Sequence, residues 1–285
     1  EALASQGWAT AVTMGTDYFD RTGGFFQGFA DANQVPIYKP PRARTVDDAL
    51  PQLRQLGAGT RPWFLWVHLF NVHEEYLWDR VPSRFGTTPL DAYDTEITFA
   101  DTEVQRLLAE LTRLGLDDKT IVAIASDHGE AFGEHNNRGH SFTLYDEELR
   151  SVLMIRAPSI APSVVREAVP LMDLMPTLLD LARVPVPRPM PARSLVPRMM
   201  GRAAATTARP IYSERMPDGL YPFDVKSVRR GRHKLLWWGR EGRTELYDLE
   251  RDPREQNDLS DSDPHTREEL LGLLPVDLRT PVDIR

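Results

Sequence analysis

Three short apolar segments, separated by a helical pattern, constrain the fold of this chain most strongly. Residues 63–70 (WFLWVHLF) are a nearly continuous apolar run, and 120–126 (TIVAIAS) and 151–155 (SVLMI) are two further β-rich runs. Strands that are apolar on both faces are typical of sheets covered by helices on both sides. Between the first two runs, residues 91–114 place apolar side chains near helical spacing before Gly115. The alternation predicts an α/β fold with a mainly parallel sheet flanked by helices.

The rest of the chain divides into a core and a smaller carboxyl-terminal region. We expect a helix end at 1–7, a strand at 8–14, an irregular loop over 15–44, and helices at 45–57 and 174–183. Beyond residue 205, strands within 221–238 and 243–249 are joined by short glycine turns and followed by a helix near 265–274. The sequence therefore predicts an α/β core over 1–204 and a small antiparallel β subdomain with a terminal helix over 205–285.

Composition excludes several classes of function. Across 285 residues, 42 acidic side chains outnumber 34 basic ones, giving a net charge of −8. A chain of this charge, with no long basic run, is a poor candidate for binding nucleic acid. There are no cysteines, so disulfides, a cysteine nucleophile and thiolate metal ligands are excluded within these residues. The longest apolar run, 63–70, is too short to span a bilayer.

Histidines gather where two of the predicted strands end. Five of the seven histidines lie between His68 and His140, and Asp127-His128-Gly129 directly follows the run 120–126. Open α/β sheets place their sites at the carboxyl ends of strands. A carboxylate beside an imidazole at such an edge suits a divalent cation. The alternative is an aspartate that caps a turn beside a histidine packed on the sheet, and these three residues alone leave both interpretations open.

Longer motifs around these residues resemble a known family. Residues 127–148 (DHGEAFGEHNNRGHSFTLYDEE) are similar to the D-[HN]-G, G-E-H-G and H-x-T-L-Y-[DE]-E landmarks of the sulfatase family, in the alkaline-phosphatase superfamily. Residues 64–76 (FLWVHLFNVHEEY) and 93–111 (YDTEITFADTEVQRLLAEL) resemble further landmarks, and the resemblance covers nearly the whole chain. It implies an alkaline-phosphatase-like fold and a sulfuric ester hydrolase.

The resemblance also implies roles for matching residues. Asp127 and His128 would be two ligands of a single active-site metal ion. His73 would contact the ester and donate a proton to the leaving oxygen, and His140 would contact the sulfuryl or phosphoryl oxygens. Such groups offset the charge that develops during the reaction. The family implies calcium, whereas the imidazole of His128 is a better ligand for zinc or manganese, so the identity of the metal stays open.

The chain also departs from the family pattern. The nucleophile motif C-x-P-S-R, whose cysteine becomes formylglycine, does not occur, and neither does the amino-terminal pair of aspartate ligands. We expect both outside this chain, as in an amino-terminally truncated sulfatase-like enzyme that is inactive in this form; the alternative is a short chain that has lost catalysis. Near His73, the residues Asn71, Val72 and Glu75 replace the family's Asp, Pro and Pro. Among the other histidines, His68 is expected to be a core residue, and the role of His135 is left open.

Three functions follow as expectations. The first is metal-dependent hydrolysis of a sulfate ester of a small molecule or glycan. The second is hydrolysis of a phosphodiester, phosphonate or phosphoryl group on the same fold, and the third is a non-catalytic fragment or pseudoenzyme. Nucleic acid is not an expected partner, and membrane attachment is expected only through an amino-terminal segment outside the chain. Family analogy favours a periplasmic, extracellular or membrane-attached protein.

Overall fold

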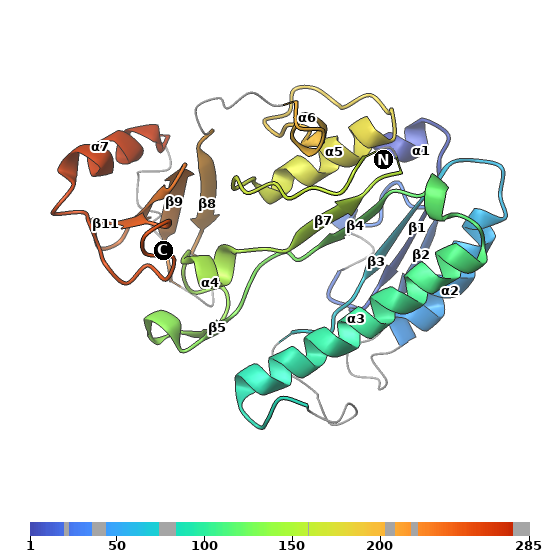
Figure 1. Ribbon diagram of the computed structural model, residues 1–285, viewed down its shortest axis with the longest axis horizontal. Coiled ribbons are helices and arrows are strands. Elements are labelled where there is room, and N and C mark those ends of the chain that lie inside the picture. Colours follow the sequence, from blue (N-terminus) through green and yellow to red (C-terminus); the bar gives the residue numbers. More distant parts are fainter. Residues whose placement is uncertain are drawn as a thin grey trace. The chain divides into compact units, whose positions relative to one another are not determined.

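The structure is a computed structural model that describes residues 1–19, 23–35, 44–73, 84–158, 160–202, 209–217 and 222–275. The chain forms two compact units, which Figure 1 shows in ribbon form. The first comprises Glu1–Ile121, Ala157–Ser159 and Leu178–Pro191, and the second comprises Val122–Arg156, Ile160–Thr177 and Ala192–Arg285. The sequence-based domain boundary at residues 204 and 205 lies outside the described residues and stays a proposal.

A three-stranded parallel sheet forms the centre of the first unit. Its order is β2 (Asp31–Gln34), β1 (Ala9–Met14) and β3 (Trp63–His68), and both outer strands run parallel to β1. The middle strand is almost completely buried, as its apolar sequence requires. The predicted strands at 8–14 and 63–70 are therefore confirmed. The expectation of an irregular loop over 15–44 is wrong at β2, whose sequence DANQ carries no strand pattern and which pairs through its backbone.

Helices cover this sheet. The short helix α1 (Ala2–Ser5) precedes β1, and α2 (Arg44–Gly57) packs on β1 and β3. The Thr13 hydroxyl donates a 2.6 Å hydrogen bond to the Gln52 side chain, which joins β1 to α2. The long helix α3 (Pro89–Arg113) begins at a capping box between Thr88 and Asp91, and η3 (Asp117–Lys119) follows it. The helices predicted at 45–57 and 91–114 are confirmed.

The first part of the second unit is a pair of strands, β4 (Val122–Ala125) and β7 (Leu153–Arg156). Both were predicted as strands, but they pair antiparallel with Val122 opposite Arg156, in a sheet separate from that of β3 among the described residues. The parallel arrangement expected from sequence therefore holds for β1, β2 and β3 and is wrong for β4 and β7. Between them lie β5 (Ala131–Phe132), η4 (Glu134–Asn136), β6 (Arg138–Gly139) and α4 (Asp146–Leu149).

An antiparallel sheet of four strands, in the order β11-β10-β9-β8, completes the second unit. The strands are β8 (Ile211–Arg215), β9 (Val225–Arg230), β10 (His233–Trp238) and β11 (Arg243–Asp248), and α7 (Pro264–Leu273) packs on β9 and β10. Leu235, Leu246 and Leu270 belong to a buried cluster between helix and sheet. These elements confirm the predicted antiparallel strands and terminal helix. Between β7 and β8 the chain forms three short helical elements, η5 (Leu171–Asp173), α5 (Leu174–Leu181) and α6 (Val196–Met199).

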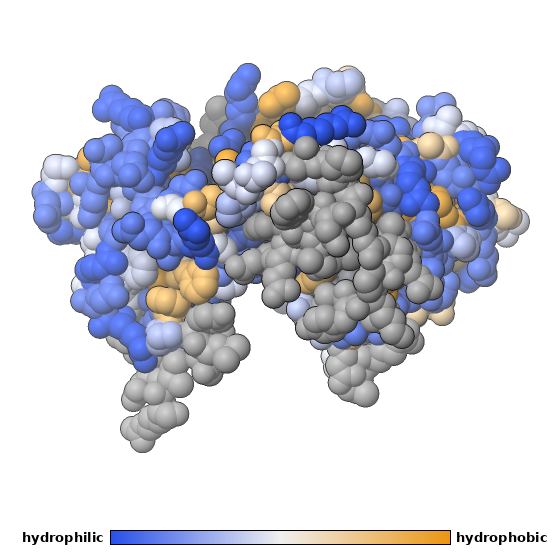
Figure 2. Space-filling view, turned by 90° about the horizontal axis from the view of Figure 1, so that it is seen from below, coloured by the Kyte–Doolittle hydropathy of each residue, from blue (hydrophilic) through white to orange (hydrophobic). Residues whose placement is uncertain are grey.

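Hydrophilic residues predominate among the described residues on one face of the molecule (Figure 2). On the face shown in Figure 2, hydrophobic residues of the described part of the chain form small groups among hydrophilic ones. Among the described helices, none combines the length and the hydropathy that crossing a membrane requires.

Candidate active site

The end of β4 holds Asp127 and His128 in place through backbone contacts. The Val152 amide donates to the Ser126 hydroxyl at 2.9 Å, and the Gly129 amide donates to the Glu148 carbonyl at 2.7 Å. Gly129 is required here because a Cβ atom at this position would lie 2.2 Å from the Glu147 carbonyl oxygen. The segment after the strand is therefore fixed against the α4 region.

The side chains of Asp127 and His128 lie beside each other and are open to solvent. Their exposed fractions are 82% and 39%, and Asp127 Oδ2 lies 3.7 Å from His128 Nε2. The Nδ1 of His128 lies 2.7 Å from the Gly129 carbonyl, which only accepts, so the ring proton belongs on Nδ1. That tautomer leaves a lone pair on Nε2 beside the carboxylate. An imidazole fixed through its second nitrogen is the usual form of a metal-ligating histidine.

A second pair, Glu130 and His140, lies beside the first. The His140 ring stacks on the His128 ring with 4.3 Å between centroids and 30° between planes. Its Nδ1 donates to Glu130 Oε1 at 3.2 Å, and the Glu130 side chain is only 3% exposed. A buried carboxylate bonded to one ring nitrogen fixes the orientation of the imidazole. The structure therefore brings together three of the four predicted site residues: Asp127, His128 and His140.

The donor set fits one part of a metal site. The carboxylate oxygen and the imidazole nitrogen are of the types that bind divalent cations, and their 3.7 Å separation lets both reach one ion. Within the described ranges, no group of three or more His, Cys, Asp or Glu side chains is arranged to hold a metal ion. Asp127 and His128 could therefore supply two ligands, and a complete coordination shell would need others.

The fourth predicted residue, His73, lies in the first unit, in the turn that follows β3. Its ring stacks on Phe70 with 4.5 Å between centroids. His68, at the end of β3, is half-buried, with the ring centroids of Phe19 and Phe70 at 6.3 and 6.1 Å, and its assignment as a core residue stays a prediction. The proton-donor role of His73 stays a prediction, and Glu75, one of the noted departures from the family pattern, lies outside the described residues.

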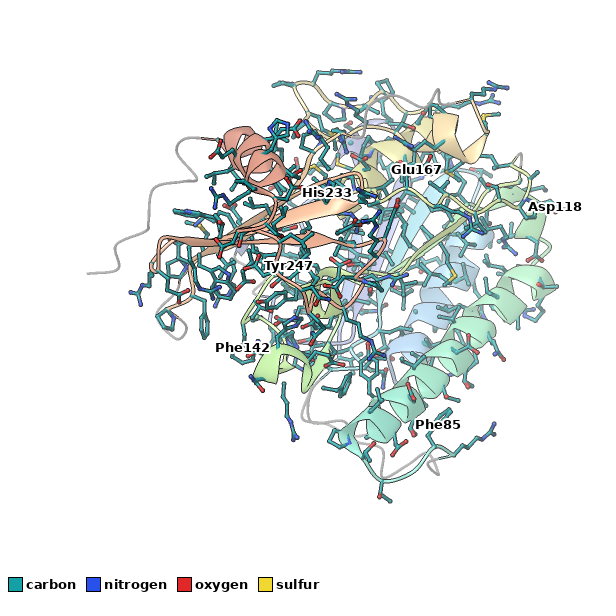
Figure 3. All side chains as sticks on the ribbon, turned by 60° about the vertical axis from the view of Figure 1, so that its left-hand side comes forward. Phe85, Asp118, Phe142, Glu167, His233 and Tyr247 are labelled. Carbon is teal, nitrogen blue, oxygen red and sulfur yellow. The ribbon has the colours of Figure 1, made fainter. Side chains whose placement is uncertain are left out.

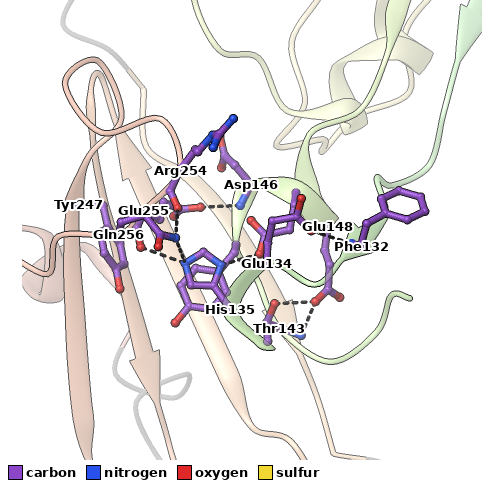
Figure 4. A network of polar contacts seen from close by, with 12 residues as sticks. Phe132, Glu134, His135, Thr143, Asp146, Glu148, Tyr247, Arg254, Glu255 and Gln256 are labelled. Carbon is purple, nitrogen blue, oxygen red and sulfur yellow. Dashed lines mark hydrogen bonds and ion pairs between the residues drawn. The ribbon is translucent and has the colours of Figure 1, made fainter. Parts of the chain in front are cut away.

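A network of polar contacts supports the segment that carries His140, and Figure 4 shows its bonds between Thr143 and Glu148. The Lys234 ammonium lies 2.8 Å from Asp146 and 2.9 Å from Glu255, and its side chain is 1% exposed. The Glu148 carboxylate accepts hydrogen bonds from the amides of Phe142 and Thr143. Burial raises the pKa of Glu255, although Lys234 opposes this shift.

These supporting residues were not predicted from the sequence. The available signal was a charged side chain inside an apolar strand, as with Lys234 in HKLLWW, because an ammonium there needs a buried partner. The partners, Asp146 and Glu255, lie far away along the chain. The aromatic residues near the network also lie far apart along the chain. The Tyr145 and Tyr247 hydroxyls both donate to Glu245, at 2.6 and 3.0 Å. Tyr247, on β11, is labelled in Figure 3.

Comparison with known proteins defines the fold class first. A solved structure of a protein in complex with its substrate D-glucosamine-2-N,6-O-disulfate superposes with a TM-score of 0.72 over 96% of this chain and 80% of that one, at 18% identity. The phosphonate monoester hydrolase of Agrobacterium radiobacter gives 0.72 over 98% and 79%, also at 18% identity. The fold is therefore the mixed α/β, alkaline-phosphatase-like fold, with a parallel sheet and a carboxyl-terminal antiparallel sheet.

Sequence comparison then defines the family. The sulfatase family model matches residues 3–184, and the model described as N-sulphoglucosamine sulphohydrolase, C-terminal, matches residues 133–272. The choline-sulfatase of Rhizobium meliloti is 27% identical over 248 residues, which cover 71% of this chain and 47% of that protein. The chain belongs to the sulfatase family. It spans less than half the length of the first curated relatives it matches.

Proposed function

We propose that this chain forms part of an enzyme that hydrolyses a sulfate ester at a site built on Asp127, His128 and His140. The observation that carries the proposal is their grouping in a member of the sulfatase family. Two donor atoms lie 3.7 Å apart, and the ring of His140 stacks on that of His128. Likeness to a choline-sulfatase and to a protein that binds a disulfated glucosamine supports a sulfated small molecule or glycan as substrate.

Each residue has a distinct proposed role. Asp127 and His128 would hold a divalent cation, which neutralises negative charge on the bound sulfate group. Glu130 accepts a hydrogen bond from His140 Nδ1–H and thereby orients the ring, and the protonated ring would donate its Nε2–H to the sulfuryl oxygens. His73 would give a proton to the leaving alcohol oxygen as the bond between sulfur and that oxygen breaks. The nucleophile, formylglycine by family resemblance, has no cysteine precursor among these 285 residues.

The metal is proposed as a single divalent ion. Family resemblance favours calcium, but calcium prefers oxygen ligands, and the lone pair on His128 Nε2 favours manganese or zinc. Metal analysis of the protein as purified, before any addition of metal, decides between these ions.

The assignment of roles is tested in the full gene product by comparing Asp127→Ala with His140→Ala. Losing a group that contacts the transition state should lower kcat about 100-fold while the metal content stays unchanged. Losing a charged metal ligand should remove the ion first. His265→Ala, an exposed position on α7, is the matched control and should change neither quantity. If His140→Ala loses the metal and Asp127→Ala keeps it, the two roles are wrongly assigned.

Phosphoester or phosphonate hydrolysis is the second candidate, favoured by the structural likeness to a phosphonate monoester hydrolase. The ratio of kcat/KM for 4-nitrophenyl sulfate to that for 4-nitrophenyl phenylphosphonate separates the two. A ratio well above one supports the sulfatase, and a ratio well below one supports the second candidate. Turnover of neither compound by the metal-loaded full gene product supports the non-catalytic alternative.

A further inference from the structure

His135 lies at the tip of a hairpin whose base carries the proposed site. β5 pairs with β6 through Ala131 opposite Gly139, and Glu130 and His140 flank these two strands. The tip is η4, where His135 and Asn136 have φ values of +45° and +59°. Asparagine tolerates this left-handed region, whereas a histidine there is strained and needs other contacts to hold it. The position of the hairpin base therefore depends on what holds its tip.

Both ring nitrogens of His135 face acceptors (Figure 4). Nδ1 lies 2.6 Å from Glu147 Oε1, and Nε2 lies 2.9 Å from the Glu255 carbonyl oxygen. The Gln256 side-chain nitrogen is also 3.4 Å from Nε2, but the shorter contact is to a carbonyl, which only accepts. A neutral imidazole has one N–H and satisfies one of these acceptors, whereas an imidazolium satisfies both. The ring also lies flat on Tyr145, with 3.6 Å between centroids.

The charges around His135 balance when its ring is cationic. Lys234 and Arg229 contact Asp146, and Lys234 also contacts Glu255, so these four groups neutralise one another. Glu147 is then left for His135, with which it forms an ion pair. Burial acts to lower the pKa of His135, but hydrogen bonds to the Glu255 carbonyl and the Glu147 carboxylate outweigh it, so the net shift is upward from 6.5.

We propose that His135, as an imidazolium, is a positioning residue that ties the β5–β6 hairpin to the turn containing Glu255 and thereby holds Glu130 and His140 in place. The effect of His135 on turnover rests on the proposed function, but its contact with the turn containing Glu255 does not. A cationic ring that bridges Glu147 and the Glu255 carbonyl links two segments 120 residues apart in sequence. Since the raised pKa belongs to the folded state, this stabilisation is complete below pH 6.5 and is lost as the pH rises through the folded-state value.

The test uses hydrogen exchange of the peptide 131–142 in the full gene product, together with kcat and KM. His135→Ala removes both hydrogen bonds and should raise the exchange rate of this peptide about 10- to 100-fold. It should lower kcat more than it raises KM and leave the metal content unchanged. His135→Asn tolerates a positive φ and keeps one donor, so its exchange should be intermediate. Exposed His265→Ala is the control. Exchange in His135→Ala equal to that in the wild type would overturn the proposal.

A second variant keeps the test decisive if His135→Ala does not fold. Glu147→Gln retains an acceptor oxygen but removes the charge, so His135 should lose its proton at a lower pH, as followed by its ¹⁵N chemical shifts. An unchanged titration of His135 would contradict the ion pair. If the wild type hydrolyses no sulfate ester but His135→Ala still speeds exchange in the hairpin, the proposed function is wrong and the positioning role of His135 is supported. If the wild type is active and His135→Ala leaves the exchange rate unchanged, only the positioning role is wrong.

Discussion

Replacement of Glu148 by alanine should destabilise the second unit and loosen the segment after His140. The carboxylate is 3% exposed and accepts three hydrogen bonds: from the Phe142 amide at 3.0 Å, the Thr143 amide at 3.1 Å and the Thr143 hydroxyl at 2.6 Å. Each buried donor left without a partner costs about 1–3 kcal/mol. The hydroxyl rotates to another acceptor more easily than the two amides do, so we expect a loss of about 3 kcal/mol in the free energy of unfolding.

Urea denaturation measures that loss, and hydrogen exchange at the Phe142 and Thr143 amides locates it. Glu148→Gln keeps one acceptor oxygen and should lose about half as much as Glu148→Ala. Glu250→Ala, an exposed position in the turn after β11, is the control and should stay within about 0.5 kcal/mol of the wild type. A Glu148→Ala protein as stable as the control, with both amides still protected, would show that the Glu148 carboxylate does not stabilise this segment.

Two further predictions concern local structure. Thr88→Ala removes half of the capping box of α3 and should lower stability by about 1 kcal/mol, measured by thermal unfolding; a larger loss for the exposed Thr112→Ala would show that the cap is not the cause. Gly129→Ala places a Cβ atom 2.2 Å from the Glu147 carbonyl oxygen and should displace Asp127 and His128, the two proposed metal ligands. Metal content should therefore fall in Gly129→Ala, and full occupancy would contradict the contact.

The sequence predicted those helices and strands whose own side chains form a clear apolar pattern. β1 and β3 were found because nearly every residue is apolar, and α3 because its apolar spacing ends at Gly115, which has a φ of +66°. β2 was missed because its sequence, DANQ, pairs through the backbone alone. The antiparallel pairing of β4 with β7 was also missed, since an apolar run indicates burial but not the direction of its neighbour.

In the candidate site, too, some contacts could be predicted from the sequence and others could not. Asp127 and His128 are adjacent in sequence and follow a strand, so their proximity was predictable. The contact between Glu130 and His140 depends on the β5–β6 hairpin, whose strands are two residues each and leave no periodic pattern. The pairing of Lys234 with Asp146 and Glu255 depends on segments that only the folded second unit brings together. Such long-range pairs are not encoded in local spacing.

Anomalous X-ray diffraction from crystals of the full gene product grown with Mn²⁺ would locate a divalent cation held by Asp127 and His128. We expect an anomalous peak about 2.0–2.4 Å from an Asp127 carboxylate oxygen and from His128 Nε2. His140 should lie beside the ion without binding it, with its Nδ1 still bonded to Glu130. An anomalous peak that touches neither Asp127 nor His128, or one with His140 as a ligand, would contradict this expectation.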